Sequence, residues 1–189
     1  MDVIILSAGL GSRLKPVTHY LPKPMIAINR EPLIRRHLRY INEISENIFI
    51  NLSFHAAALL SYIADPKILF FYEPQPRGTW PFIKEIATSI SLAEKIILIS
   101  ADIYVDEQFY LSLKKENITP CFYFNNKKSI DNFAGLAILK RSDILESQSN
   151  SLAEFILEFQ DSYDVNYVSP FYKNISTVID WQEANQLGI

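Results

Sequence analysis

The sequence predicts an α/β protein with three layers: a doubly wound, mostly parallel sheet that carries helices on both faces. Short apolar runs alternate along the chain with segments in which apolar residues recur every three or four positions. The runs are continuous rather than alternating apolar with polar residues, which is typical of strands buried on both faces. A β-α-β-α order of this kind favours a doubly wound sheet.

The expected strands are Val3–Leu6, Ile48–Leu52, Ile68–Tyr72, Ile96–Ile99, Phe122–Phe124 and Phe133–Leu139. The expected helices are Leu33–Ile41, Ala57–Ile63, Phe82–Ile90, Leu152–Phe159 and Asp180–Leu187. Asp106 is expected to cap a further helix. In such sheets ligands bind beyond the carboxyl ends of the strands, so we expect the chemistry in the loops after Leu6 and Ile99.

Length and composition set the broad class of protein. The chain has 189 residues, of which 49% are hydrophobic and 21% charged, and its formal net charge is −3. These values predict one folded domain, residues 1–189, without a basic field for nucleic acid. No apolar run approaches the roughly 20 residues that span a bilayer, and the N-terminus has no signal-peptide pattern, so we expect a cytoplasmic protein. The single cysteine, Cys121, is expected in the core.

The loop after the first expected strand carries two of the five glycines, Gly9 and Gly11. Glycines there allow a tight turn and let backbone N–H groups approach a phosphate. The spacing matches neither G-x-G-x-x-G nor a P-loop, so the glycines alone are a weak signal. Arg13 and Lys23 follow, and Lys23 lies between two prolines that restrict its backbone. Both cations suit phosphate; a polar surface loop without a ligand is the competing interpretation.

Residues 6–18, Leu-Ser-Ala-Gly-Leu-Gly-Ser-Arg-Leu-Lys-Pro-Val-Thr, and residues 21–25, Leu-Pro-Lys-Pro-Met, together resemble the signature of the sugar-phosphate nucleotidylyltransferases. The resemblance implies a Rossmann-like fold and a glycine loop around a nucleoside triphosphate. It assigns catalytic contacts with phosphates to Arg13 and Lys23. The nucleotide-binding residues that it implies in the loop are Ala8, Gly9, Leu10, Gly11 and Ser12.

Two further segments resemble the same family. Residues 99–102, Ile-Ser-Ala-Asp, are similar to a strand end whose aspartate binds the catalytic Mg²⁺, so the resemblance makes Asp102 a catalytic residue and metal ligand. Residues 73–79, Glu-Pro-Gln-Pro-Arg-Gly-Thr, are similar to a loop that approaches the base and sugar, which implies nucleotide contacts for Gly78 and Thr79. The next aromatic residues, Trp80 and Phe82, either line the acceptor site or pack in the core.

The C-terminal segment, residues 172–185, resembles the family's second metal-binding stretch with departures. Asn174 stands where the family has an aspartate, and Ser176 and Val178 replace its glycine and proline. The carbonyl of Asn174 can still coordinate Mg²⁺, with lower expected affinity because one negative charge is missing. Asp180 with Glu183 is expected to form a capping box at the start of the last helix.

The resemblance implies Mg²⁺-dependent transfer of a nucleotidyl group from a nucleoside triphosphate to a sugar 1-phosphate, with release of pyrophosphate, by a monomer or homodimer. It is closest to the compact mannose-1-phosphate guanylyltransferase and N-acetylmuramate-1-phosphate uridylyltransferase branch, without an appended β-helix domain. Two alternatives stay open. Choline-phosphate cytidylyltransferases share the Ala-Gly-Leu-Gly-Ser-Arg loop, and 13% aromatic residues would allow a cage for phosphocholine. The departures in residues 174–178 would also suit a nucleotide-binding protein that has lost catalysis.

Overall fold

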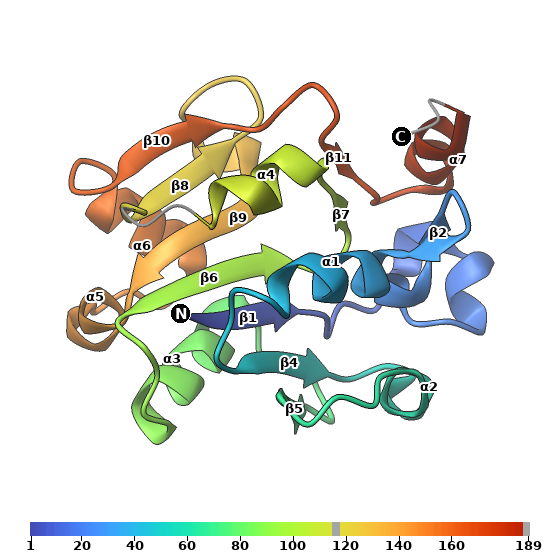
Figure 1. Cartoon of the computed structure of the whole chain (residues 1–189), viewed down its shortest axis with the longest axis horizontal. Coiled ribbons are helices and arrows are strands. Elements are labelled where there is room, and N and C mark those ends of the chain that lie inside the picture. The colour runs from blue at the N-terminus through green and yellow to red at the C-terminus, as the bar shows by residue number, and fades with distance from the viewer. Residues whose placement is uncertain (115–117, 187–189) are drawn as a thin grey trace.

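The computed structural model describes residues 1–114 and 118–186, and its centre is a seven-stranded sheet (Figure 1). The order of the strands is β10-β8-β9-β6-β1-β4-β5. Their bounds are β1 (Asp2–Leu6), β4 (Ile48–Leu52), β5 (Ile68–Tyr72), β6 (Lys95–Ser100), β8 (Cys121–Phe124), β9 (Phe133–Lys140) and β10 (Asp164–Tyr167). β1 runs parallel to β4 and β6, and β4 parallel to β5, whereas β9 is antiparallel to both neighbours. The predicted, mostly parallel sheet is confirmed.

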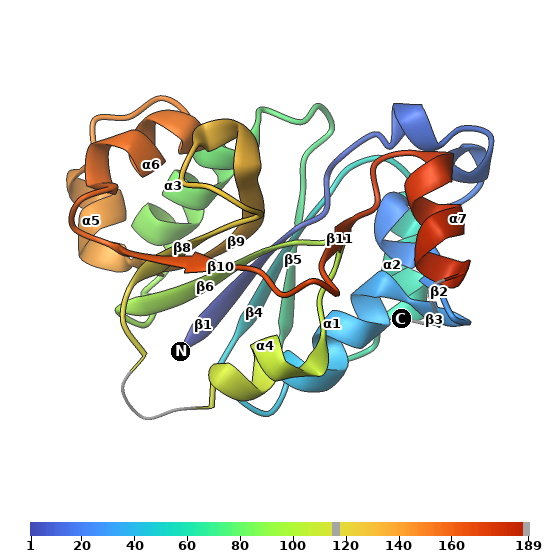
Figure 2. The same ribbon diagram turned by 90° about the horizontal axis from the view of Figure 1, so that it is seen from above.

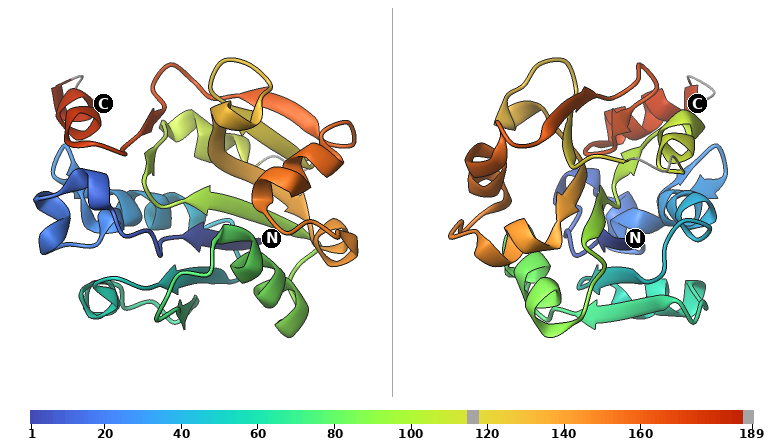
Figure 3. Two further views of the ribbon diagram at one scale, coloured as in Figure 1. Left: turned by 180° about the vertical axis from the view of Figure 1, so that it is seen from behind. Right: turned by 60° about the vertical axis from the view of Figure 1, so that its left-hand side comes forward.

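Helices cover both faces of this sheet, as the view along its edge shows (Figure 2). One face carries α1 (Leu33–Ile41), α2 (Ala56–Tyr62) and α4 (Glu107–Ser112). The other face carries α3 (Thr79–Ser89), α5 (Arg141–Glu146) and α6 (Leu152–Phe159), which lie in front of the sheet in the rear view (Figure 3). The three-layer architecture is therefore also confirmed.

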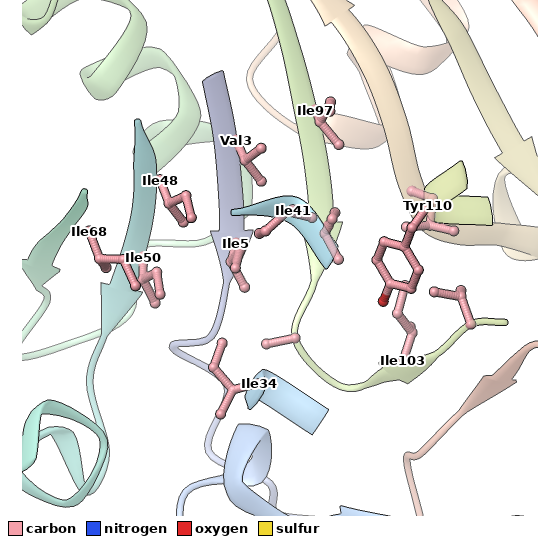
Figure 4. Close-up of a cluster of buried hydrophobic side chains, with 14 of the residues drawn as sticks. Val3, Ile5, Ile34, Ile41, Ile48, Ile50, Ile68, Ile97, Ile103 and Tyr110 are labelled. Carbon is pink, nitrogen blue, oxygen red and sulfur yellow. The ribbon is translucent and has the colours of Figure 1, made fainter. Parts of the chain in front are cut away.

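The core is divided by the sheet into two apolar clusters. Along β1, Val3 and Ile5 point to the α1 face while Ile4 points to the α3 face, and all three are fully buried. Figure 4 shows the first of these clusters, where β1, β4 and β6 meet α1 and α4. Because each strand is covered on both sides, its apolar residues are consecutive. Cys121 is buried in the same cluster, as expected.

Trp80 and Phe82 belong to the second cluster, on the inward face of α3. Both side chains are buried, and the Trp80 ring lies 4.5 Å from the ring of Phe155 on α6, centroid to centroid. The Trp80 Nε1 donates a hydrogen bond to the carbonyl of Ser149. These two aromatic residues therefore pack in the core rather than line an acceptor site.

Two small antiparallel pairs and the last helix complete the molecule. They are β2 (Ala27–Ile28) with β3 (Glu31–Pro32), β7 (Ile103–Tyr104) with β11 (Lys173–Asn174), and α7 (Val178–Gln186). The capping box of α7 lies three residues before the predicted one: the Thr177 hydroxyl accepts from the Asp180 N–H at 3.2 Å, and the Asp180 carboxylate accepts from the Thr177 N–H at 2.7 Å. Glu183 instead pairs with Lys173. Leu187, the predicted end of this helix, lies outside the described residues.

The described helices include none that is long and apolar enough to cross a membrane. Asp106 caps α4 as predicted, with its carboxylate accepting a hydrogen bond of 3.0 Å from the Phe109 N–H.

We predict that Gly135→Ala destabilises the protein by about 1 to 3 kcal/mol, because Gly135 in β9 has a φ of +72° and a Cβ there would lie 2.9 Å from the Cβ of Ser100. Urea unfolding measures the loss. Gly9→Ala is the matched control, since a Cβ at Gly9 meets no described atom within 4 Å and its φ is not positive. Equal midpoints for the two variants would contradict the strain argued for Gly135.

Candidate active site

A cavity of about 280 Å³ opens at the carboxyl-end edge of the parallel strands. Its lining comes from the ends of β1, β4, β5 and β6 and from the loops that follow them. The lining residues are Leu6, Ser7, Ala8, Gly9, Lys23, Pro24, Asn51, Glu73, Pro76, Gly78, Thr79, Ser100, Ala101 and Asp102. The structure thus brings six predicted site residues to one cavity: Ala8, Gly9, Lys23, Gly78, Thr79 and Asp102.

The two glycines of the first loop have different structural roles. Gly9 lines the cavity beside open space. Gly11 has a φ of +62°, and a Cβ there would lie 2.8 Å from the methyl carbon of Thr18. The Thr18 hydroxyl donates to the Gly11 carbonyl at 2.7 Å, which closes the turn. Gly9 therefore leaves room for a ligand, whereas Gly11 is required by the backbone.

The outer part of this loop lies away from the cavity wall. Leu10, Gly11, Ser12 and Arg13 are not among the lining residues, and the Arg13 side chain is exposed on a short 3₁₀ helix, Ser12–Leu14. The buried side chain of Leu14 anchors that helix in a third apolar cluster. The structure therefore leaves the Arg13 side chain exposed to solvent and outside the cavity lining.

An ion pair between Lys23 and Asp102 lies at the wall of the cavity. Lys23 lies in a 3₁₀ turn, Lys23–Met25, and its ammonium donates to the Oδ2 of Asp102. Ser100, at the end of β6, donates its hydroxyl to the Oδ1 of Asp102 at 2.6 Å. The Lys23 and Asp102 side chains are only 11% and 24% exposed. A largely desolvated ammonium with fixed geometry can interact strongly with an anionic ligand such as a phosphate.

A second polar group lines the other end of the cavity and was missed by the sequence reasoning. Asn51 in β4 accepts a hydrogen bond from the Ser7 N–H at 2.6 Å through its Oδ1, and donates through its Nδ2 to Glu73 at 2.8 Å. Asn51 and Glu73 are 4% and 3% exposed. Asn51 lies in an otherwise apolar strand, and a polar residue in such a run was the signal that could have identified it.

The segment behind Asp102 is supported from α1. Arg36 donates from Nε and Nη2 to the carbonyl of Val105, at 3.1 and 3.0 Å, and its guanidinium lies 4.3 Å from the centre of the Tyr104 ring. At the next residue along α1, the Nδ1 of buried His37 lies 2.8 Å from the Tyr110 hydroxyl. These contacts fix the chain between Asp102 and α4.

Asn174 lies next to Asp102 in the backbone but outside the cavity lining. In the β7–β11 pair Asn174 is opposite Ile103, and the N–H of Ile175 donates to the Asp102 carbonyl at 2.9 Å. The Asn174 side chain is exposed, and its Oδ1 accepts from the Ser176 hydroxyl at 2.7 Å. The structure therefore shows the proximity of the two chain segments without bringing both side chains to the cavity wall.

The oxygen donors at this edge suit a hard divalent cation only in part. Asp102 supplies one carboxylate, and the described residues contain no cluster of three or more His, Cys, Asp or Glu that could hold a metal alone. Mg²⁺ in nucleotide sites is commonly held by one or two carboxylates together with substrate phosphates and water. The single Asp102 carboxylate at the wall of this cavity fits that arrangement.

Known proteins resemble this chain in sequence and in fold. A sequence model described as nucleotidyl transferase matches residues 2–119. Over 149 residues the chain is 26% identical to the bifunctional protein GlmU of Methanococcus aeolicus. The matched region covers 78% of this chain and 36% of that protein. Over 90 residues it is 33% identical to the D-glycero-alpha-D-manno-heptose 1-phosphate guanylyltransferase of Campylobacter jejuni, with 45% and 41% covered. The chain thus spans about a third of the first curated relatives it matches.

Among solved structures, HddC from Yersinia pseudotuberculosis complexed with GMP-PN superposes with a TM-score of 0.69 at 23% identity, covering 100% of this chain and 99% of that one. At this identity the likeness shows a shared fold.

We predict that stability falls with pH below about 6.5 because of His37. The pKa of His37 is lowered to about 4, mainly by burial and secondly by the charge of Arg36. The charge of Asp102 has the opposite, smaller effect on this pKa. Between that value and the ordinary one of about 6.5, the unfolded chain binds the proton and the folded chain does not, so acid favours unfolding. The loss between pH 7.5 and pH 5 should be about 2 kcal/mol by urea unfolding. His37→Gln should lose this part of the pH dependence, whereas exposed His19→Gln should keep it.

Proposed function

Because the chain belongs to the nucleotidyl transferase family, we propose that it transfers a nucleotidyl group from a nucleoside triphosphate to a sugar 1-phosphate and releases pyrophosphate. The observation that carries the proposal is the Lys23–Asp102 pair, which lies in one cavity with the glycine loop. The relatives that match in sequence include a heptose 1-phosphate guanylyltransferase, so a phosphorylated sugar is a suitable acceptor.

The proposed reaction needs a positioned nucleophile rather than a general base. The second pKa of a phosphate monoester is about 6, so an oxygen of the sugar phosphate is already anionic at neutral pH. That oxygen attacks the α-phosphorus, the bond from the α-phosphorus to the bridging oxygen breaks, and pyrophosphate leaves. The task of the protein is to hold two polyanions in line and to offset the charge between them.

We assign this task to three parts of the cavity. Backbone N–H groups at Ala8 and Gly9 hold the triphosphate, and Arg13, exposed on the 3₁₀ helix that follows, reaches its outer phosphates. Lys23 moves from Asp102 to bridge the α-phosphate and the acceptor, which frees the Asp102 carboxylate. Gly78 and Thr79, at the start of α3, contact the nucleoside.

Asp102 would hold Mg²⁺, with Asn174 as the second proposed ligand, and the bound ion would offset negative charge on the phosphates. The support is the carboxylate of Asp102 at the cavity wall and the pairing of β11 beside it.

A phosphocholine acceptor is the second candidate, favoured by an aromatic cavity of about 220 Å³ beside β7. Its lining includes Phe109, Tyr123, Tyr167 and Tyr172, together with the Asp106 carboxylate. Tyr172 directly precedes β11, whose Asn174 lies opposite Ile103, the residue after Asp102. Pyrophosphate release is measured with CTP and phosphocholine, and separately with a panel of sugar 1-phosphates. The acceptor that supports release decides between the two candidate functions.

We predict that Lys23→Met lowers turnover by at least about a hundredfold, because the cation that bridges the reacting phosphates is removed. Pyrophosphate release measures it, with circular dichroism to verify the fold. Lys95→Met is the matched control, since Lys95 begins β6 at the opposite edge of the sheet. Normal turnover in Lys23→Met would contradict the role assigned to Lys23. A wild-type chain that binds a triphosphate but releases no pyrophosphate with any acceptor would instead favour a protein that has lost catalysis.

We predict that Asn174→Asp tightens Mg²⁺ binding in the presence of nucleotide, because a second carboxylate adds a full negative charge next to Asp102. Isothermal titration of Mg²⁺ into the nucleotide complex measures the change. Asn166→Asp, in β10 and outside the cavity lining, is the control for added charge. An unchanged Mg²⁺ titration would show that Asn174 is not at the metal.

A further inference from the structure

Glu73 is a buried carboxylate at the end of the cavity that is remote from the reacting phosphates. It follows β5, while Asp102 follows β6, and β1 and β4 lie between those two strands. At about 4.8 Å per strand, the two ends are about 14 Å apart. A nucleotide with its phosphates at Lys23 would therefore extend its base toward Glu73.

The hydrogen bonds around Glu73 leave acceptor capacity on both carboxylate oxygens, because each oxygen can accept two hydrogen bonds. Its Oε2 accepts from Asn51, whereas its Oε1 is buried and has no hydrogen-bond donor among the described residues. The nearest cation is Arg77, whose Nε lies 3.4 Å from Oε1 and whose side chain is 55% exposed. Arg77 is not part of the cavity lining and also pairs with Glu85 on α3. Arg77 therefore offsets the negative charge of Glu73 from outside the cavity.

The Asn51 amide is held in one orientation and is not free to turn toward a base. Its Oδ1 is used by the Ser7 N–H and its Nδ2 by Glu73, so both ends of the amide are engaged and its orientation is fixed. The polar group that this end of the cavity offers to a ligand is therefore the Glu73 carboxylate, which is an acceptor. Donors are supplied by the neighbouring first turn of α3, whose backbone N–H groups have no partner within the helix.

Among the common bases, only guanine presents two adjacent hydrogen-bond donors to a carboxylate. Guanine presents N1–H and the 2-amino group side by side, with O6 as an acceptor beyond them. Uracil and thymine present one N–H between two carbonyls, and cytosine and adenine present an amino group next to an unprotonated ring nitrogen. A carboxylate accepts and does not donate, so it pairs with the guanine edge in a bidentate manner and is repelled by the acceptors of the others.

We propose that Glu73 selects guanine, so that the nucleotide donor is GTP, and that Asn51 positions the Glu73 carboxylate. This proposal rests on the proposed function, which places a nucleotide in this cavity, and adds the identity of the base.

The test is isothermal titration with GTP, ITP, UTP, CTP and ATP in the presence of Mg²⁺ and without acceptor. We expect wild-type protein to bind GTP most tightly and ITP, which lacks only the 2-amino group, about tenfold more weakly. In Glu73→Gln a donor replaces one acceptor oxygen, so GTP binding should fall about tenfold or more and the GTP-to-ITP ratio should approach one. Glu85→Gln, the matched control on the exposed side of Arg77, should keep the wild-type ratio.

The outcomes separate this proposal from the proposed function. Binding of none of the five nucleotides overturns the proposed function itself. Tight binding of another base with weak GTP overturns the guanine proposal and leaves nucleotidyl transfer standing. A GTP preference that persists in folded Glu73→Gln overturns the role of Glu73. Should that variant fail to fold, an equal affinity of wild-type protein for GTP and ITP still contradicts the proposal.

Discussion

The parallel pairing of β1 with both β4 and β6 brings three of the polar parts of the cavity to one edge of the sheet. Because these neighbouring strands run in the same direction, their carboxyl ends meet at one edge of the sheet. There the glycine loop follows β1, Asn51 lies near the end of β4, and Asp102 follows β6. The two apolar clusters hold that edge rigid, so loops of little regular structure are presented in fixed positions.

Much of this arrangement could be predicted from the sequence, because it depends on local patterns. Consecutive apolar residues identified the buried strands, and the bounds of Leu33–Ile41 and Leu152–Phe159 agree with α1 and α6 residue for residue. The glycine loop and Asp102 follow strands directly, so their place at the sheet edge follows from the fold class. The strand β10 was not predicted, because its side chains are mostly exposed and carry no apolar run.

The remaining features depend on contacts between segments far apart in the sequence. The Asn51–Glu73 pair requires the register of β4 against β5, and no local pattern encodes that register. The start of α7 was misplaced because Thr177 and Asp180 can each cap a helix, and only the packing of the C-terminal segment decides between them. Likewise, Trp80 and Phe82 have the same sequence signal whether they line a cavity or pack against α6.

The central position of β1 also determines how the chain can fold as it is synthesised. β1 is made before both of its partners, yet it lies between β4 and β6, and Val3 is paired with Ile48 on one side and Ile97 on the other. The backbone groups of this strand cannot be satisfied on both sides until about half of the chain has emerged. Long-range parallel pairing is slow to form, and an apolar strand that waits for its partners is exposed to misassociation. The segment that ends in the glycine loop is thus made well before the strands that enclose it on both sides.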